Sequence, residues 1–189
     1  EACEFPVTLM VRARPDYLFT YADKLERALA TLGERGTLMP YLIGFENFSD
    51  DELSRYNKGL TSEDLIAAVA RLQHLAATHS NLALSPSHGF ILFGPWTTPT
   101  DLQANVDALQ QLNFRALRGN ILSSKLRLYP DNALVARAHA DGLLVDQFAA
   151  EYEANASVTG YQAELPYRFA HQETARVWDL LHGPDPVRG

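Results

Sequence analysis

Residues 41–64 read YLIGFENFSDDELSRYNKGLTSED and contain the pattern that decides the fold. The apolar run begins before this stretch, but Pro40 cannot donate a hydrogen bond to a sheet ladder, so the regular strand is predicted at 41–45. Glu46 follows directly, where the strand should end. We therefore expect a short buried strand with a carboxylate at its carboxyl end.

Two helix starts follow this strand. Ser49 precedes Glu52 by three residues, which is the spacing of a capping box and predicts a short helix. Thr61 or Ser62 provides a second cap, after which apolar residues recur at helical spacing as far as Ala76. The stretch therefore predicts a strand, a short helix and a long helix in succession.

Strand and helix patterns alternate on both sides of this stretch. Their order predicts right-handed crossovers and a mostly parallel sheet, as in an α/β protein. Spacing alone fits both part of a TIM-like β/α barrel and an open doubly wound sheet. The further elements predicted are a buried strand at 5–11, a helix at 15–33, a strand at 88–93, a helix from 98–101 to 112, a strand within 122–129, and helices at 132–140 and 173–181.

Composition restricts the partners. The formal net charge is -7 and the Lys and Arg residues are dispersed, so the sequence lacks the basic stripe of a nucleic-acid-binding protein. No apolar run approaches the roughly 20 residues that cross a bilayer, and the N-terminus has no signal-peptide pattern. We therefore expect neither nucleic acid nor membrane as a partner, and a cytoplasmic location. Cys3 is the single cysteine, which excludes an intrachain disulfide and fits a reducing compartment.

The candidate binding residues lie where predicted strands end, because parallel α/β proteins bind ligands beyond the carboxyl ends of their strands. Arg12 and Arg14 follow the first strand, Glu46 the second and Gly94 the third. A glutamate carboxylate can accept hydrogen bonds from both hydroxyls of a ribose, and a guanidinium can clamp a carboxylate. A glycine lets a flat ring approach the backbone closely.

Each candidate also has a purely structural interpretation. Glu46 can be a helix-start or salt-bridge glutamate, and either arginine can pair on the surface with Asp16. Gly94 can be a loop glycine, and Trp96 after it can either wall a pocket or pack at a rim. The residues alone leave these alternatives open.

Other chemistries lack their residue patterns. His74 and His79 are five positions apart, which misses the one-face helical spacing of zinc proteases, and the other histidines stand alone, so no metal site is expected. The sequence contains no G-x-S-x-G elbow, P-loop or G-x-G-x-x-G fingerprint. No catalytic residue is assigned.

Residues 41–64 resemble the fourth-strand region of radical S-adenosylmethionine enzymes, and most of all the group that often carries a cobalamin-binding domain upstream. In that group, a strand ending in a glycine and an acidic residue leads to a short helix, an Asn-Lys-Gly turn and a long helix. Here the turn is Asn57, Lys58 and Gly59, and the order matches throughout.

Two further segments are similar to the same family. Residues 89–102 (GFILFGPWTTPTDL) resemble its fifth strand, with Trp96 where a small residue is common. Residues 128–131 (LYPD) resemble its Tyr-Pro-Gly-Thr segment, with Asp131 in place of glycine. The resemblance covers about residues 5–145. It implies that residues 1–145 are the C-terminal portion of a partial β/α (TIM-like) barrel, with 146–189 as a C-terminal helical extension.

The resemblance also implies roles. Glu46 takes the ribose-binding acidic position, Gly94 lies near the adenine, and Arg12 or Arg14 meets the methionine moiety of S-adenosylmethionine. The family uses a 4Fe-4S cluster, and its cobalamin-linked members also use cobalamin. Its reaction is reductive cleavage of S-adenosylmethionine to an adenosyl radical, which abstracts hydrogen from a small-molecule substrate.

The three-cysteine motif that holds the cluster is missing from this sequence. We therefore expect an upstream part of the same polypeptide to supply the cluster ligands, without which the chain would be inactive. The alternative is a non-catalytic α/β binding or assembly module that keeps the barrel pattern.

Overall fold

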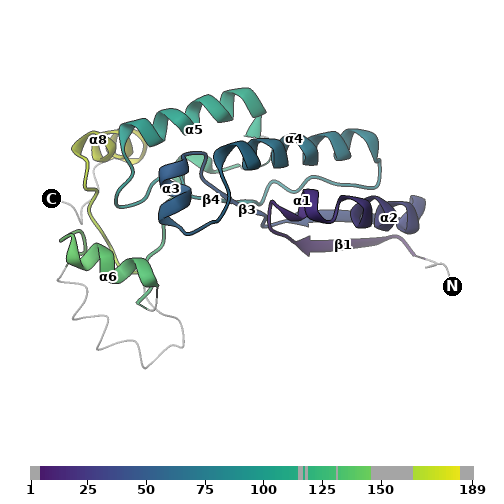
Figure 1. Cartoon of the computed structure of the whole chain (residues 1–189), viewed down its shortest axis with the longest axis horizontal. Helices are drawn as coiled ribbons and strands as arrows, with labels where there is room; N and C mark the ends of the chain where they lie inside the picture. Colours follow the sequence, from purple (N-terminus) through teal and green to yellow (C-terminus); the bar gives the residue numbers. More distant parts are fainter. Residues whose placement is uncertain (1–4, 115–116, 118, 131, 146–163, 184–189) are drawn as a thin grey trace. The chain divides into compact units, whose positions relative to one another are not determined.

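The computed structural model describes residues 5–114, 117, 119–130, 132–145 and 164–183 (Figure 1). The chain divides into two units: unit 1 comprises Glu1–Phe90 and Asp101–Ile121, and unit 2 comprises Ile91–Thr100 and Leu122–Gly189. In the described residues, the strands form two parallel two-stranded sheets among helices. The predicted α/β class with parallel strands is confirmed, and the partial barrel stays a prediction.

The first sheet pairs β1 (Val7–Arg12) with β2 (Gly36–Tyr41), in register from Val7 opposite Gly36 to Arg12 opposite Tyr41. The crossover contains α1 (Tyr17–Thr20), α2 (Ala22–Leu32) and a 3-10 turn, η1 (Gly33–Arg35). The single helix predicted at 15–33 is therefore wrong in one respect, because it breaks at Tyr21, whose φ is -119°. α2 packs on β2 in this unit.

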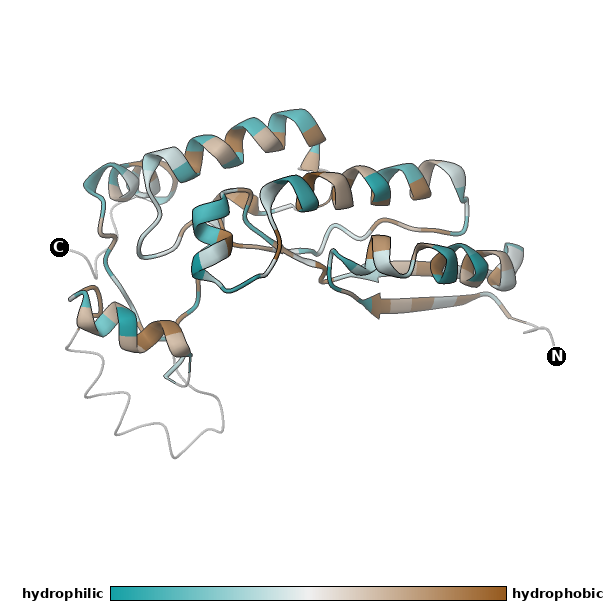
Figure 2. Cartoon of the chain, viewed as in Figure 1, coloured by the Kyte–Doolittle hydropathy of each residue, from teal (hydrophilic) through white to brown (hydrophobic). Residues whose placement is uncertain are grey.

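β1 is a strand as predicted, but the prediction that it is buried is wrong. Leu9, Met10 and Val11 are 44%, 57% and 37% exposed, although Figure 2 shows β1 as apolar along most of its length. Parallel strands are usually covered on both faces. Among the described residues only β2 pairs with β1, which leaves its other edge open.

The prediction that Pro40 delays the second strand is also wrong, because β2 includes Pro40. The backbone groups of Leu38 form their hydrogen bonds on the side of β2 that faces away from β1. The Leu38 N–H donates to the carbonyl of Asn81 at 2.8 Å, and the Leu38 carbonyl accepts from the N–H of Ala83 at 2.9 Å. Successive residues of a strand point their polar groups to opposite sides, so Pro40 also faces away from β1. Its missing N–H therefore leaves the β1–β2 ladder intact.

The second sheet pairs β3 (Gly44–Glu46) with β4 (Gly89–Phe90). Around it in unit 1 lie α3 (Asp50–Arg55), α4 (Ser62–Thr78) and most of α5 (Pro99–Leu112). Four phenylalanine rings fill the core beside this sheet, with Phe114 at 5.2–5.4 Å from the rings of Phe45, Phe48 and Phe90. The loop that follows Glu46 contributes Phe48 to this core.

Ser49 is the N-cap residue of α3 as predicted, but the capping box is not formed. Its hydroxyl donates to the Asp101 carboxylate at the start of α5, and Glu52 pairs with Arg55 at 2.6 Å. The second cap follows the predicted pattern: the Thr61 hydroxyl accepts from the N–H of Asp64 at 3.2 Å, and Asp64 accepts from the N–H of Thr61 at 2.9 Å.

Unit 2 contains α6 (Ala133–Ala140) and α8 (Gln172–His182), which confirm the two helices predicted there. The strand predicted within 122–129 is wrong: its described residues form a 3-10 turn, η3 (Ile121–Ser123), and isolated bridges from Lys125 to Phe93 and from Leu128 to Leu165. The strand predicted at 88–93 shortens to β4. Cys3 and Asp131 lie outside the described residues. The division at residue 145 stays a prediction.

Candidate functional site

Glu46 ends β3 in a left-handed backbone conformation, with φ 64°. A non-glycine residue there is uncommon and is held in place by its surroundings. The strand register shifts between Gly44 and Glu46, so the chain turns out of the ladder at this residue. The carboxylate is thereby directed back over the strand end.

The space for this carboxylate depends on Gly44 and Gly89, which pair across β3 and β4. A methyl group added at Gly44 would lie 2.4 Å from Oε1 of Glu46, and one added at Gly89 would lie 3.6 Å from Oε2. The Glu46 carboxylate therefore lies against bare backbone. Because both paired residues are glycines, neither strand carries a side chain at this level of the sheet.

Lys58 completes the contact from the turn between α3 and α4. Asn57 and Gly59 on either side of it have φ 50° and 68°, and the Lys58 N–H donates to the carbonyl of Leu53 at 2.9 Å. This turn brings Lys58 Nζ to 3.1 Å from Glu46 Oε1, with the lysine and glutamate side chains 14% and 26% exposed. An ionised carboxylate has about four acceptor positions, so Glu46 can bind Lys58 and a further donor together.

The two candidate arginines have different partners. Arg14 Nε donates to Asp16 at 3.0 Å, which is the surface pair that the sequence left open, and its Nη2 lies 3.5 Å from the Lys58 carbonyl. Arg12 Nε donates to the Tyr41 hydroxyl at 3.1 Å, with its guanidinium 5.5 Å from the ring centre. Arg14 therefore contacts the Lys58 turn that carries the partner of Glu46, whereas Arg12 contacts the end of β2.

Gly94 belongs to unit 2 and lies in a tight turn. Its N–H donates to the Thr97 hydroxyl at 2.8 Å, and the Thr97 N–H returns to the Gly94 carbonyl at 3.3 Å. Lys125 follows in the segment bridged to Phe93, with its ammonium 4.6 Å from the ring centre of Tyr167. Trp96 is buried, and its indole donates to Asp141 at 2.7 Å, so it packs within unit 2.

This arrangement can be compared with known proteins. No protein-family model matches the sequence, and no curated protein matches it. Among solved structures, a cobalamin-dependent S-adenosylmethionine radical enzyme superposes on 94% of the chain with a TM-score of 0.65. The chain shares its fold with part of that enzyme, OxsB.

OxsB is 15% identical to this chain, so the likeness concerns the fold alone. The chain spans 29% of the length of the OxsB chain that it matches. The OxsB structure contains aqua-cobalamin and S-adenosylmethionine.

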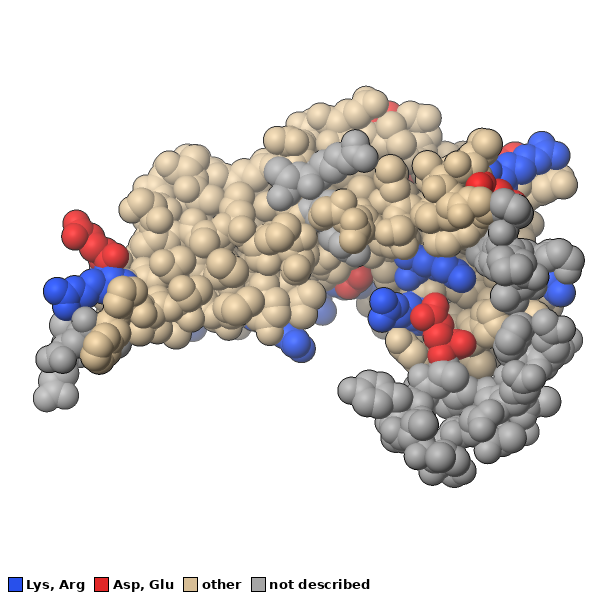
Figure 3. Space-filling model, turned by 180° about the vertical axis from the view of Figure 1, so that it is seen from behind, with Lys and Arg blue, Asp and Glu red and all other residues tan. Residues whose placement is uncertain are grey.

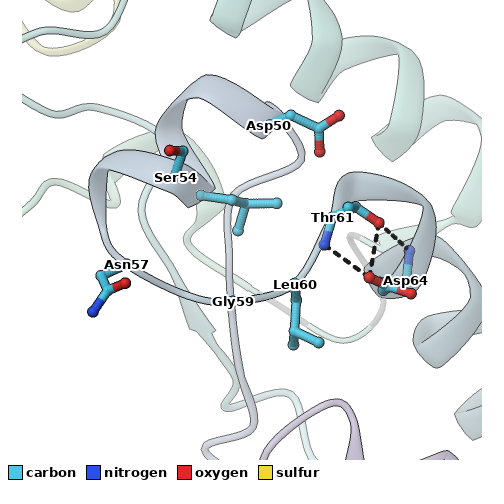
Figure 4. A pocket seen from close by; sticks show the side chains of 8 residues that line it. Asp50, Ser54, Asn57, Gly59, Leu60, Thr61 and Asp64 are labelled. Atoms are coloured by element: carbon cyan, nitrogen blue, oxygen red, sulfur yellow. Dashed lines mark hydrogen bonds between the residues drawn. The ribbon is translucent and has the colours of Figure 1, made fainter.

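A shallow pocket of about 470 Å³ lies elsewhere in unit 1, between α3 and the start of α4 (Figure 4). None of the four predicted binding residues lines it. Its two carboxylates are already used by α4: Asp50 accepts from the Ser62 N–H at 2.6 Å, and Asp64 forms the capping box with Thr61. We therefore place the candidate site at Glu46 rather than in this pocket.

Replacing Asp64 by alanine should lower the free energy of unfolding by about 1 kcal/mol at pH 7, as for the loss of a helix cap. The backbone and side-chain hydrogen bonds from Thr61 lower the pKa of Asp64. A carboxyl group with a lowered pKa stabilises the fold above its unfolded pKa of about 4, and this contribution is lost as the pH falls through the folded pKa.

Chemical denaturation at several pH values would measure this effect. The gap between wild type and Asp64→Ala should narrow below pH 4, with Glu63→Ala as the control that keeps the capping box. An unchanged gap at low pH would contradict a stabilising charge on Asp64.

Other site types find no support in the described parts of the chain. There, no three His, Cys, Asp or Glu side chains converge in a way that could hold a metal ion. No helix among the described residues has the length and apolar character needed to span a membrane. In the view of Figure 3, the Lys and Arg side chains lie at separate points rather than in a stripe.

Two residues of the site were not assigned from the sequence. From the sequence, Lys58 is only the middle residue of the Asn-Lys-Gly turn. Its neighbours Asn57 and Gly59 are residue types that readily adopt left-handed backbone, which indicates a fixed turn and therefore a fixed direction for the Lys58 side chain. Asn105 of α5, described below, had no signal of its own, because a single polar residue on a helix is usually exposed.

Proposed function

We propose that unit 1 holds the ribose of S-adenosylmethionine through Glu46, as part of an enzyme with radical S-adenosylmethionine chemistry. The observation that carries the proposal is the Glu46 carboxylate, which lies at the carboxyl end of a parallel strand, is paired with Lys58 and remains 26% exposed. Two ribose hydroxyls can donate to one carboxylate, and the contact with Lys58 leaves acceptor positions of Glu46 for them. The fold shared with OxsB supports this choice of ligand.

The other predicted residues have less direct support. Arg14 lies beside the Lys58 turn, and we propose it before Arg12 as the basic group that meets the methionine carboxylate. Gly94 stays the proposed position for the adenine, because its turn presents backbone without a side chain. Cobalamin is proposed from the resemblance and from OxsB, and no residue of this chain is assigned to it.

The residues fit S-adenosylmethionine but not the iron–sulfur cluster. Such clusters are held by cysteine thiolates, and the sequence has one cysteine, Cys3. We therefore propose that the cluster ligands come from a part of the polypeptide beyond these 189 residues. S-Adenosylmethionine bound beside a reduced cluster supplies radical chemistry on a small-molecule substrate.

The exposure of strand β1 supports the proposal that a further part of the polypeptide completes the site. Within the described ranges no strand pairs with the edge of β1 opposite β2, and Leu9, Met10 and Val11 leave apolar area exposed. A further parallel strand along this edge would satisfy the backbone groups and cover the apolar side chains. A parallel sheet that continues past β1 is the arrangement that we propose.

The test is binding of S-adenosylmethionine by the full-length protein, measured by calorimetry. Glu46→Gln keeps the shape of the side chain but removes its charge, and it should weaken binding about tenfold or more, since a hydrogen bond to a charged group contributes about 1.5–3 kcal/mol. The wild type should also prefer S-adenosylmethionine over its 2′-deoxy analogue, and the variant should not.

Glu26→Gln is a matched control, because Glu26 is also a paired carboxylate of unit 1 but binds Arg71 on the helical surface. It should bind both ligands as the wild type does. Equal affinities of the wild type and Glu46→Gln for S-adenosylmethionine would refute the proposed role of Glu46.

A further inference from the structure

The loop after Glu46 is held by a buried amide that no part of the proposed function uses. Asn105 lies on α5 and is 0% exposed, as is Asn47, the residue that follows Glu46. The two side chains meet, with Asn105 Nδ2 donating to Asn47 Oδ1 at 2.8 Å. Both belong to unit 1.

Asn105 uses both ends of its amide. Its Oδ1 accepts from the backbone N–H of Phe48 at 2.9 Å, and its Nδ2 also donates to the carbonyl of Asp101 at 2.7 Å. Asn47 Oδ1 accepts in addition from the N–H of Ser49 at 2.8 Å. Asn47 and Phe48 therefore bond to Asn105 directly, and Ser49 is connected to it through the Asn47 side chain.

This attachment bears on Glu46 because of the backbone conformation there. A left-handed glutamate persists only where the neighbouring chain is fixed on both sides. On one side β3 pairs with β4, and the Phe45 carbonyl accepts from the Asn47 N–H at 2.9 Å. On the other side the described contacts of the loop lead to α5, through Asn105 and through the hydroxyl of Ser49 on Asp101.

We propose that Asn105 is a positioning residue that keeps the Glu46 carboxylate directed toward the ribose. The inference rests on the proposed function of Glu46 and adds a residue that does not touch the ligand. Without the amide, the loop from 47 to 49 can relax, and Glu46 can leave its left-handed conformation and turn its carboxylate away from Lys58.

The test measures a ratio of affinities rather than a single affinity. The wild type should bind S-adenosylmethionine about tenfold more tightly than the 2′-deoxy analogue. Asn105→Ala should reduce this preference to about twofold or less, because a displaced carboxylate no longer accepts from the 2′ hydroxyl that distinguishes the two ligands. A purely structural role would lower both affinities by the same factor and preserve the ratio.

Gln73→Ala is the matched control. Gln73 of α4 also uses a side-chain amide to bind backbone of α5, donating to the Leu112 carbonyl at 2.7 Å, but at the C-terminal end of α5, seven residues beyond Asn105. It should keep the tenfold preference. If Asn105→Ala does not fold, Asn105→Ser leaves a hydroxyl in the same space and should lose most of the preference.

The outcomes separate the two proposals. Loss of the preference in Glu46→Gln together with a retained preference in the folded Asn105 variant would overturn the positioning role alone. A wild type without any preference would overturn the proposed role of Glu46, and with it the positioning of that residue. Loss of the preference in both variants but not in Gln73→Ala supports the proposal.

Discussion

Replacing Phe114 by alanine should lower the free energy of unfolding by about 3–5 kcal/mol, the usual cost of deleting a buried aromatic ring. Phe114 is 0% exposed, and its ring meets those of Phe45 and Phe48 edge to face at 5.2 and 5.4 Å. The remaining rings are held by the sheet and by the loop after β3, so the core cannot collapse into the space. Such a loss is a large part of a typical domain stability of about 5–15 kcal/mol.

Denaturant titration would measure this loss. Phe19→Ala is the control, because Phe19 lies on α1 with 47% of its surface exposed, and surface substitutions usually change stability by about 0.5 kcal/mol or less. Similar losses in the two variants would mean that the four-ring core does not form. Phe114 also packs against Phe48 of the loop after Glu46, so the variant should weaken S-adenosylmethionine binding in addition.

Replacing Gly44 by alanine should produce the opposite pattern, with a large effect on binding and a small one on stability. The new methyl group would lie 2.4 Å from Glu46 Oε1 and 3.0 Å from Lys58 Nζ. Both are terminal atoms of flexible side chains, so they can move aside at little cost to the fold. The carboxylate would nevertheless leave the strand end, and we expect binding of S-adenosylmethionine to weaken about tenfold or more.

Calorimetry and thermal unfolding on the same sample would test the Gly44→Ala prediction. Gly119→Ala is the control, since a methyl group there meets no atom within 4 Å in the described structure and the backbone is not left-handed. It should bind as the wild type does. Unchanged binding by Gly44→Ala would show that the carboxylate does not need its place against Gly44 and Gly89.

The sequence predicted those parts of the fold that depend on local periodicity. α4 begins after Thr61, one of the two predicted cap residues, and α8 matches its predicted span closely, because each has an apolar face at regular helical spacing. The strands were less predictable, since burial depends on neighbours that are distant in sequence. The apolar pattern of β1 could not reveal an uncovered edge, and Pro40 could not reveal the side of β2 on which its missing N–H falls.

The residues of the candidate site also differ in how far local sequence could predict them. Glu46 was predictable because it follows an apolar run directly, and Gly44 and Gly89 are visible as glycines at strand positions. Contacts across long sequence separations were not predictable. Asp101 removes the Ser49 hydroxyl from its predicted capping box, and Lys58 reaches Glu46 only because the intervening turn has two left-handed residues.

The attachment of the Glu46 loop to α5 also has a consequence for the order of folding. Phe48 and Asn105 are 57 positions apart, and Asn47 and Asn105 are 58 apart. Contacts of this kind form after local ones, because closing a long loop costs chain entropy before the contact is gained. The backbone at Glu46 is therefore expected to reach its final conformation only once α5 has docked, and a transient departure of α5 would release the carboxylate while β1 and β2 remain paired.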